Sequence, residues 1–290
     1  MVLKSFTGLR IMGMRHSERL DHIDPNWFKG LKKVSDYNRF DLNMPYEIPY
    51  RNNFEEFEED TVLTLFGTML AQFTGKGLAL SNSVPDYVYC SPALRSIQTA
   101  MGVLEGSGSN AKIRIEPGLF ENCTLYENKK IPKFMTLEEL LKAGFEDIDY
   151  SYKSYWSLDD LFPIERTEED YIKRFNETVS AIQKVHAGEQ ASILLTGHAS
   201  TVDLLLSHYY ERDKPYEVKY LSRMGDFVPY CSIIGFDQEK KNRKNFLFNK
   251  NICLPFTKYN FTTEYDSKFV YRDIKELQHF VYSSDEKYIN

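Results

Sequence analysis

Short strand-like segments that alternate with helical patterns constrain the fold of this chain more than any other feature. Four segments have the length and pattern of strands, at residues 9–14, 87–90, 113–116 and 192–196. Helical patterns lie at residues 61–73, from 92 onward, at 167–186 and at 202–210. Strands that alternate with helices form a mostly parallel sheet that is covered by helices on both faces. We therefore predict an α/β fold, a three-layer α/β/α sandwich.

Local signals predict where two of these helices begin and end. Gly75 and Gly77 follow the first helical pattern and are expected to terminate it. Ser91 and Pro92 follow the second strand, which predicts a serine N-cap and a proline at the first helical position. Two further strands are expected at residues 231–236 and 245–248, separated by a charged turn.

Charged side chains follow the ends of the four predicted strands. In chain order they are Arg15, His16, Arg19, Arg95, Glu121 and His198. A basic residue also follows a strand when the chain simply reaches solvent, so no single one of them identifies a site. Parallel strands bring their C-terminal ends to one edge of the sheet, where the ligands of α/β proteins bind. We therefore expect these six side chains to converge on one site the size of a phosphate group.

The residue types at these strand ends suit attack on a phosphoryl group. The imidazole of His16 can act as a nucleophile, and guanidinium groups bind phosphate oxygens bidentately. Arg95 falls in the first turn of a helix, where the dipole disfavours a cation unless an anion lies alongside. Glu121 is predicted to be a partly buried carboxyl with a raised pKa, suited to donating a proton. The alternative for Glu121 is a loop glutamate in water.

The segment from residue 22 to residue 50 has no clear helix or strand pattern. Its prolines exclude a long helix, and its many aromatic residues predict an ordered loop. This loop is expected either to form a wall of the substrate pocket or to cover the sheet edge. The acidic cluster at residues 54–60 is expected to be a solvated surface or the acidic first turn of the next helix.

Composition excludes several classes of function. The formal net charge is -6, and there is no basic stripe with interleaved aromatic residues, which argues against nucleic-acid binding. The four cysteines are widely spaced and form no Cys-x-x-Cys pair, which argues against a zinc or redox motif. No signal peptide or membrane-spanning apolar run is present, so we expect a cytoplasmic protein without a membrane partner.

Four motifs in this order resemble those of a known family. They are Arg15-His16-Ser17-Glu18-Arg19, the run from Ser91 to Ala100 that holds Arg95, Glu116-Pro117-Gly118-Leu119-Phe120-Glu121, and Gly197-His198-Ala199-Ser200. The chain resembles the histidine phosphatase (phosphoglycerate mutase-like) superfamily. Within it, the chain is most similar to the phosphatase domain of the UBA- and SH3-containing suppressors of T-cell receptor signalling and to ecdysteroid-phosphate phosphatases. The resemblance implies one domain over residues 1–290, with an inserted aromatic and proline-rich segment at about 22–80 and a C-terminal extension at about 250–290.

The resemblance also implies roles for the six side chains. His16 would be the nucleophile that becomes phosphorylated, while Arg15, Arg19, Arg95 and His198 would hold the phosphoryl oxygens. Glu121 would protonate the leaving oxygen, and no metal or cofactor would be required. A homodimer is implied as well. The sequence departs from the family at Ser17, where the family usually has glycine. A side chain there is expected to impair activity if the backbone needs a positive φ or a close approach to the phosphate.

Other functions compete with this hypothesis. A cysteine-dependent tyrosine phosphatase needs a His-Cys-x-x-x-x-x-Arg loop, with five residues between the cysteine and the arginine. This function is rejected, because only four residues separate Cys90 from Arg95 and Cys90 lies within a strand. A phosphoglycerate mutase would use the same histidine chemistry. A phosphate-binding protein without turnover is the third alternative. The aromatic segment at residues 27–50 favours a phosphatase for esters with an aromatic or apolar leaving group, such as phosphotyrosine in a peptide or a steroid phosphate.

Overall fold

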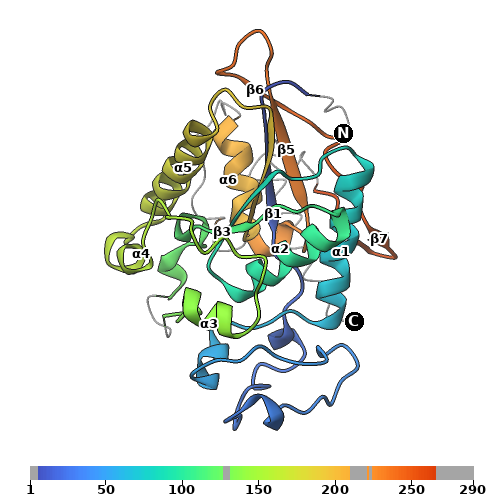
Figure 1. Ribbon diagram of the computed structural model, residues 1–290, viewed down its shortest axis with the longest axis vertical. Coiled ribbons are helices and arrows are strands. Elements are labelled where there is room, and N and C mark those ends of the chain that lie inside the picture. Colours follow the sequence, from blue (N-terminus) through green and yellow to red (C-terminus); the bar gives the residue numbers. More distant parts are fainter. Residues whose placement is uncertain (1–5, 127–130, 210–220, 222–223, 266–290) are drawn as a thin grey trace, which may run out of the picture.

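The computed structural model describes residues 6–126, 131–209, 221 and 224–265, and its main sheet has six strands in the order β3-β2-β4-β1-β5-β6 (Figure 1). The strands are β1 (Leu9–Arg15), β2 (Tyr87–Cys90), β3 (Ile113–Ile115), β4 (Ala191–Gly197), β5 (Ile233–Gln238) and β6 (Phe246–Phe248). The first four are mutually parallel, and β5 and β6 are antiparallel to their neighbours. The prediction of a mostly parallel central sheet is confirmed.

Helices cover both faces of this sheet. They are α1 (Leu65–Leu80), α2 (Leu94–Ser107), α3 (Leu137–Lys142), α4 (Leu158–Ile164), α5 (Glu168–Val185), α6 (Ala199–Tyr209) and α7 (Met224–Phe227). Successive residues of β1 point to opposite faces: Met12 and Met14 pack in the core with α1 and α2, whereas Ile11 packs in the core with α5 and α6. Burial on both faces explains the nearly unbroken apolar pattern of this strand, which Arg10 interrupts by pairing with Asp237. The three-layer prediction is confirmed.

Helix α1 differs from its predicted bounds at both ends. It begins at Leu65 because the Thr64 hydroxyl caps it by accepting from the Gly67 N–H, and it continues through both Gly75 and Gly77 to Leu80. The prediction that these glycines end the helix is wrong. A Cβ on Gly75 would lie 2.3 Å from the carbonyl oxygen of Val103 in α2. The glycine is therefore explained by close packing of two helices rather than by helix termination.

Helix α2 begins later than predicted and is capped by a distant residue. Its N-cap is Ala93, whose side chain makes no capping bond, so Ser91 and Pro92 precede the helix. The carboxylate of Asp60 accepts a hydrogen bond from the Leu94 N–H over 2.7 Å instead. Asp60 is fully buried, so the prediction that residues 54–60 are all solvated, or form the first turn of the next helix, is wrong for this residue.

The segment between β1 and α1 contains only short 3₁₀ helices, at Leu20–His22, Val34–Asp36 and Phe54–Glu58. It lies beyond the C-terminal end of β1, below the sheet in Figure 1. The segment is ordered around its own aromatic cluster, in which the buried Trp27 ring lies 5.0 Å from that of Phe57. The prediction of an ordered loop without a long helix is confirmed.

The C-terminal part that the structure describes packs on α1. A two-stranded hairpin, β7 (Thr257–Lys258) and β8 (Phe261–Thr262), follows β6, and the Phe256 ring stacks on the Phe73 ring at 5.2 Å. Residues 266–290 of the expected C-terminal extension lie outside the described residues. No helix in the described ranges has the length and apolar character needed to cross a membrane.

Candidate active site

Backbone hydrogen bonds hold the C-terminal ends of the four parallel strands together. His16 N donates to Gly197 O over 2.8 Å, Ser91 N to Thr196 O over 2.9 Å, and Glu116 N to Cys90 O over 2.8 Å. Each of these bonds extends a parallel ladder by one step into the segment that follows the strand. The side chains that follow the strands are therefore fixed at one edge of the sheet, as the sequence predicted.

His16 is buried at this edge with its orientation fixed. Its Nδ1 lies 2.8 Å from the carbonyl oxygen of Ser17, and because a carbonyl can only accept, Nδ1 donates its proton there. The neutral ring then carries its lone pair on Nε2. Burial lowers the pKa of His16 well below its ordinary value, and the positive charges of Arg95 and Arg15 lower it further. His16 is thus a neutral imidazole with one nitrogen free to act as a nucleophile.

Arg95, Glu121 and His198 form a compact cluster beside His16. The Arg95 Nη2 lies 2.5 Å from Glu121 Oε1, and His198 Nδ1 lies 3.5 Å from Glu121 Oε2. The rings of His198 and His16 are 5.5 Å apart between centroids. Glu121 is therefore an anion of the kind that the helix dipole requires beside the fully buried Arg95.

The prediction of a raised pKa for Glu121 is wrong for the protein without substrate. Burial raises the pKa, but His198, which is protonated in the acid range where Glu121 titrates, Arg95 and the hydrogen bond from the Tyr126 hydroxyl together lower it to about 2. Glu121 is thus ionised at neutral pH. Nearby sequence could not reveal this, because Arg95 and His198 come from other strand ends.

His198 is held by Ser91, the residue that the sequence predicted to be a helix N-cap. Its Nε2 lies 2.9 Å from the Ser91 hydroxyl. Burial lowers the pKa of His198, Glu121 raises it and Arg95 lowers it, with a result of about 3. His198 is therefore neutral at neutral pH, and each of its ring nitrogens has a polar neighbour.

Arg15 and Arg19 also act on His16, because both lower its pKa. The Arg15 Nη1 donates to the carbonyl oxygens of Gly225, over 2.8 Å, and of Val228. Arg19 pairs with Asp21 at 2.9 Å. Arg15, Arg19 and Arg95 each keep a buried Nε without a hydrogen-bond partner among the described residues. Arg39 and Arg51 have the same feature, so the Nε atoms do not mark the site by themselves. The positive charges of Arg15, Arg19 and Arg95 all lower the pKa of His16, and such a concentration of positive charge is expected of a site for an anion.

Two tyrosines at the site were not found from the sequence. The guanidinium of Arg15 lies over the Tyr230 ring at 4.2 Å, and this ring is 5.7 Å from that of His16. The Tyr126 hydroxyl donates to Glu121 over 2.8 Å, and burial raises the pKa of Tyr126, which keeps this proton in place. Neither tyrosine directly follows a strand of the sheet, so inspection of strand ends gives no signal for them.

Ser17 fits the site without backbone strain. The non-glycine residues with positive φ in the described ranges are Asn82, Cys231 and Tyr259, so Ser17 does not need the conformation that favours glycine. Its side chain is buried, and its hydroxyl donates to the carbonyl oxygen of Gly67 in α1 over 2.6 Å. Ser17 thus ties the loop after β1 to α1, and the strain argument against activity fails.

We expect Ser17→Gly to leave kcat/KM within about 3-fold of the wild-type value while lowering the free energy of unfolding by about 1 kcal/mol, because a buried hydrogen bond is lost. Steady-state kinetics and urea unfolding measure the two effects. An increase in activity of 10-fold or more would show instead that the serine restrains the site.

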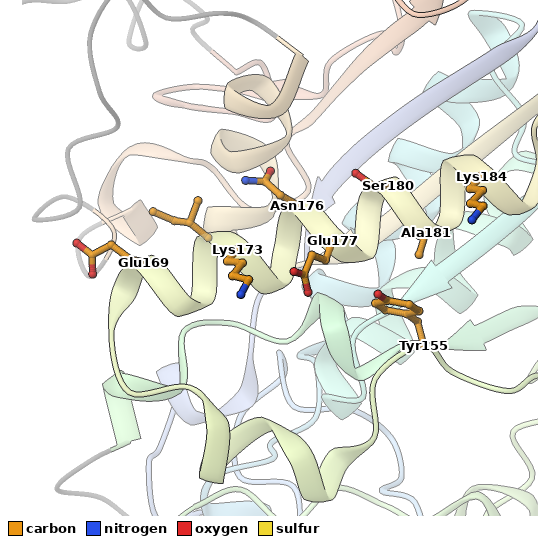
Figure 2. Close-up of a pocket in the computed structure, with 9 residues that line it drawn as sticks. Tyr155, Glu169, Lys173, Asn176, Glu177, Ser180, Ala181 and Lys184 are labelled. Carbon is orange, nitrogen blue, oxygen red and sulfur yellow. The ribbon is translucent and has the colours of Figure 1, made fainter.

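A surface groove of about 690 Å³ runs along the outer face of α5, and none of the six predicted side chains lines it. Figure 2 shows its mixed lining, with Lys173, Glu177 and Lys184 on α5 and Tyr155 reaching toward the helix from a neighbouring loop. The groove therefore has no part in the chemistry of the histidine cluster. Among the described residues, no group of three or more His, Cys, Asp or Glu side chains is arranged to hold a metal ion.

Comparison with known proteins places the chain in a family. Residues 57–233 match the sequence model of the histidine phosphatase superfamily (branch 1), a span that includes Arg95, Glu121 and His198. An ecdysteroid-phosphate phosphatase from Bombyx mori is 33% identical over 235 residues, which cover 77% of this chain and 34% of the relative. Human ubiquitin-associated and SH3 domain-containing protein B is 33% identical over 196 residues, or 65% of this chain and 30% of the relative.

The structure is similar to the crystal structure of a related phosphatase. The ecdysone phosphate phosphatase from Bombyx mori, in complex with tungstate, superposes with a TM-score of 0.73 at 30% identity and covers 86% of this chain and 95% of the other. The chain spans about a third of the length of the curated relatives it matches. The matched span, the sheet order and the superposition agree with the predicted family. The chain belongs to branch 1 of the histidine phosphatase superfamily.

Proposed function

We propose that this domain hydrolyses phosphate monoesters through transient phosphorylation of His16, without a metal. The observation that carries the proposal is the buried neutral imidazole, with Nδ1 committed to the Ser17 carbonyl and with the positive charges of three arginines acting on it. Phosphoryl transfer needs an aligned nucleophile and preorganised positive charge more than any other device. This arrangement supplies both.

In the first step, His16 Nε2 attacks phosphorus, a P–N bond forms, and the bond from phosphorus to the leaving oxygen breaks. The leaving oxygen needs a proton, and Glu121 is ionised before substrate binds. A bound phosphate dianion shares the charge of Arg95 and repels the Glu121 carboxylate, and both effects raise the pKa of Glu121. Binding of the substrate therefore converts Glu121 into the acid that donates this proton.

In the second step, water attacks phosphorus and the P–N bond breaks. Glu121, deprotonated by the first step, accepts a proton from that water, and His16 returns to its neutral form. His198 lies between Glu121 and the Ser91 hydroxyl, where it can donate a hydrogen bond to a phosphoryl oxygen. Inorganic phosphate is the second product.

An ester with an aromatic or apolar leaving group is the substrate class that we propose. The half-buried Tyr230 ring lies beside His16 and contacts His22, a residue of the segment that follows β1. Trp27 is buried within its own cluster, so Tyr230 supports the proposal better than the aromatic segment does. The similar protein from Bombyx mori is named an ecdysteroid-phosphate phosphatase, so its named substrate is a steroid phosphate. A steroid is an apolar leaving group, which supports the proposal.

The test is hydrolysis of p-nitrophenyl phosphate by the purified chain in EDTA between pH 5 and 8, with a steroid phosphate, a phosphotyrosine peptide and 3-phosphoglycerate assayed beside it. We expect phosphate release from the first three that EDTA does not reduce. Isomerisation of 3-phosphoglycerate without phosphate release would make the protein a mutase. Binding of tungstate, an analogue of phosphate, without turnover of any ester would show that the protein binds phosphate but does not catalyse its transfer.

We expect Tyr230→Leu to lower kcat/KM for p-nitrophenyl phosphate about 5- to 10-fold, the range that loss of one aromatic contact produces. Tyr230→Phe is the matched control, because it keeps the ring over Arg15 and loses only the hydroxyl contact with His22. Glycerol 2-phosphate, which has no ring to stack, should lose less than p-nitrophenyl phosphate. Equal losses for both esters would show that Tyr230 acts only through Arg15.

A further inference from the structure

We propose that Asp60 is a positioning residue for the phosphate site, because it fixes the helix turn that carries Arg95 and joins that turn to the loop that carries Arg19. The inference rests on the proposed function, since it takes both arginines as ligands of the phosphoryl group.

Asp60 belongs to a buried ion pair that the proposed chemistry does not use. Its Oδ2 lies 3.1 Å from Arg51 Nη1, and the side chains of both residues are fully buried. Arg51 is held in turn by the carbonyl oxygen of Lys133 and by the Glu56 side chain at 3.4 Å. A buried pair with this many partners fixes the position of the carboxylate.

The second oxygen of this carboxylate caps α2. Oδ1 accepts from the Leu94 N–H, and the N-cap residue Ala93 has no side-chain oxygen to do so. A negative charge at a helix N-terminus is favourable, and here it also lies near the buried cation of the next residue, Arg95. Asp60 therefore fixes the first turn of α2 where the site requires it.

The residues that follow Asp60 pair with the loop that carries Arg19. Leu20 N donates to Val62 O over 2.9 Å, and Thr64 N donates to Glu18 O over 3.1 Å, so residues 62–64 pair with residues 18–20 around Arg19. A further bond, from Leu63 N to the Gln98 side chain of α2, measures 2.8 Å. Residues 60–64 thus form a connector between the two arginine-bearing segments.

A second route ties the same helix turn to the nucleophile loop. The Thr99 hydroxyl donates to the carbonyl oxygen of Arg95 over 2.7 Å and accepts from the Ser17 N–H over 2.9 Å. Because this route does not contact Asp60, the helix and the fold should persist when Asp60 is lost. The placement of Arg95 relative to Arg19 should become looser, because residues 60–64 are then no longer bonded to the first turn of α2 through Asp60.

The experiment measures tungstate affinity by calorimetry, with kcat and KM for p-nitrophenyl phosphate, for Asp60→Ala, Asp60→Asn and the wild type. Misplacement of a binding group by about 1 Å costs up to roughly 100-fold, so we expect tungstate Kd to rise at least about 10-fold in Asp60→Ala. An asparagine has one acceptor oxygen for two donors, Arg51 and the Leu94 N–H, so we expect a rise of about 3- to 10-fold in Asp60→Asn.

The matched control is Asp237→Asn, which breaks the pair of Asp237 with buried Arg10 at the opposite end of β1. It should lower Tm while leaving tungstate Kd within about 2-fold of the wild type, because an effect through stability alone does not reach a distant site. All proteins are compared at a temperature where circular dichroism shows them folded.

If Asp60→Ala fails to fold, the tungstate Kd of Asp60→Asn decides whether Asp60 has the positioning role. An Asp60→Asn protein that binds tungstate within 2-fold of the wild type overturns the positioning role, as does an equal loss of affinity in Asp237→Asn. Failure of the wild type to bind tungstate would instead overturn the proposed function, so the two failures are distinguishable.

Discussion

His16→Ala is expected to lower kcat for p-nitrophenyl phosphate by about 10⁴-fold or more and to abolish the phosphoenzyme, because removal of a covalent nucleophile leaves only the binding groups to catalyse the reaction. The buried ring is fixed by the Ser17 carbonyl, and a methyl group in its place cannot form a P–N bond. The phosphate ligands remain, so we expect tungstate binding to be largely retained.

Rapid quenching with labelled substrate measures this effect directly. The wild type should give an acid-labile, base-stable phosphoenzyme in the first turnover, and His16→Ala should give none. His208→Ala is the matched control, because His208 lies in α6 and contacts Asn176 rather than the site. Full turnover in the His16 variant would assign the nucleophile to another residue, and His198 would be tested next.

Arg95→Ala is expected to be the second most damaging change, with kcat/KM about 10³-fold lower, the size of effect that loss of a charged ligand of the transferred phosphoryl group produces. The fully buried guanidinium also balances Glu121. Breaking a buried pair from one side costs about 3 kcal/mol. We therefore expect lower stability as well, and a raised pKa of Glu121 because the neighbouring positive charge is lost.

The variant Arg95→Lys distinguishes the loss of activity from the loss of stability. A lysine keeps the positive charge near Glu121 but not the planar fork that binds two phosphate oxygens. We expect stability in urea to recover more than kcat/KM does. Arg114→Lys is the control on the same sheet, since Arg114 pairs with Asp149 and contacts Tyr89, and its activity should stay near wild type. Full recovery of activity in Arg95→Lys would show that charge alone is needed there.

The parallel sheet and the edge where the site lies could be predicted from the sequence for a direct physical reason. A strand buried on both faces is a short, nearly unbroken apolar run, and such a run remains visible without any knowledge of its neighbours. Parallel pairing then requires that the ends meet at one edge. His16, at the end of β1, and His198, at the end of β4, were placed together on this argument alone, and their rings lie 5.5 Å apart.

Electrostatic character could not be predicted in the same way. Glu121 looked like a carboxyl with a raised pKa because burial was the only local signal. Its pKa is lowered because Arg95, 26 residues earlier, and His198 approach it. Likewise Asp60 looked solvated among its acidic neighbours, and only the approach of Arg51 and of the α2 N-terminus explains its burial.

The sequence alone thus determined the fold class, the family and the six side chains at the sheet edge, because periodicity, strand ends and motif order are local properties of the chain. Tertiary structure alone decided where α2 begins, which carboxylate caps it, that Tyr230 lies on Arg15, and that Ser91 contacts His198, 107 residues away. These features depend on contacts between segments far apart in the chain, and hydrogen bonds and ring contacts form only at the short distances that the fold sets.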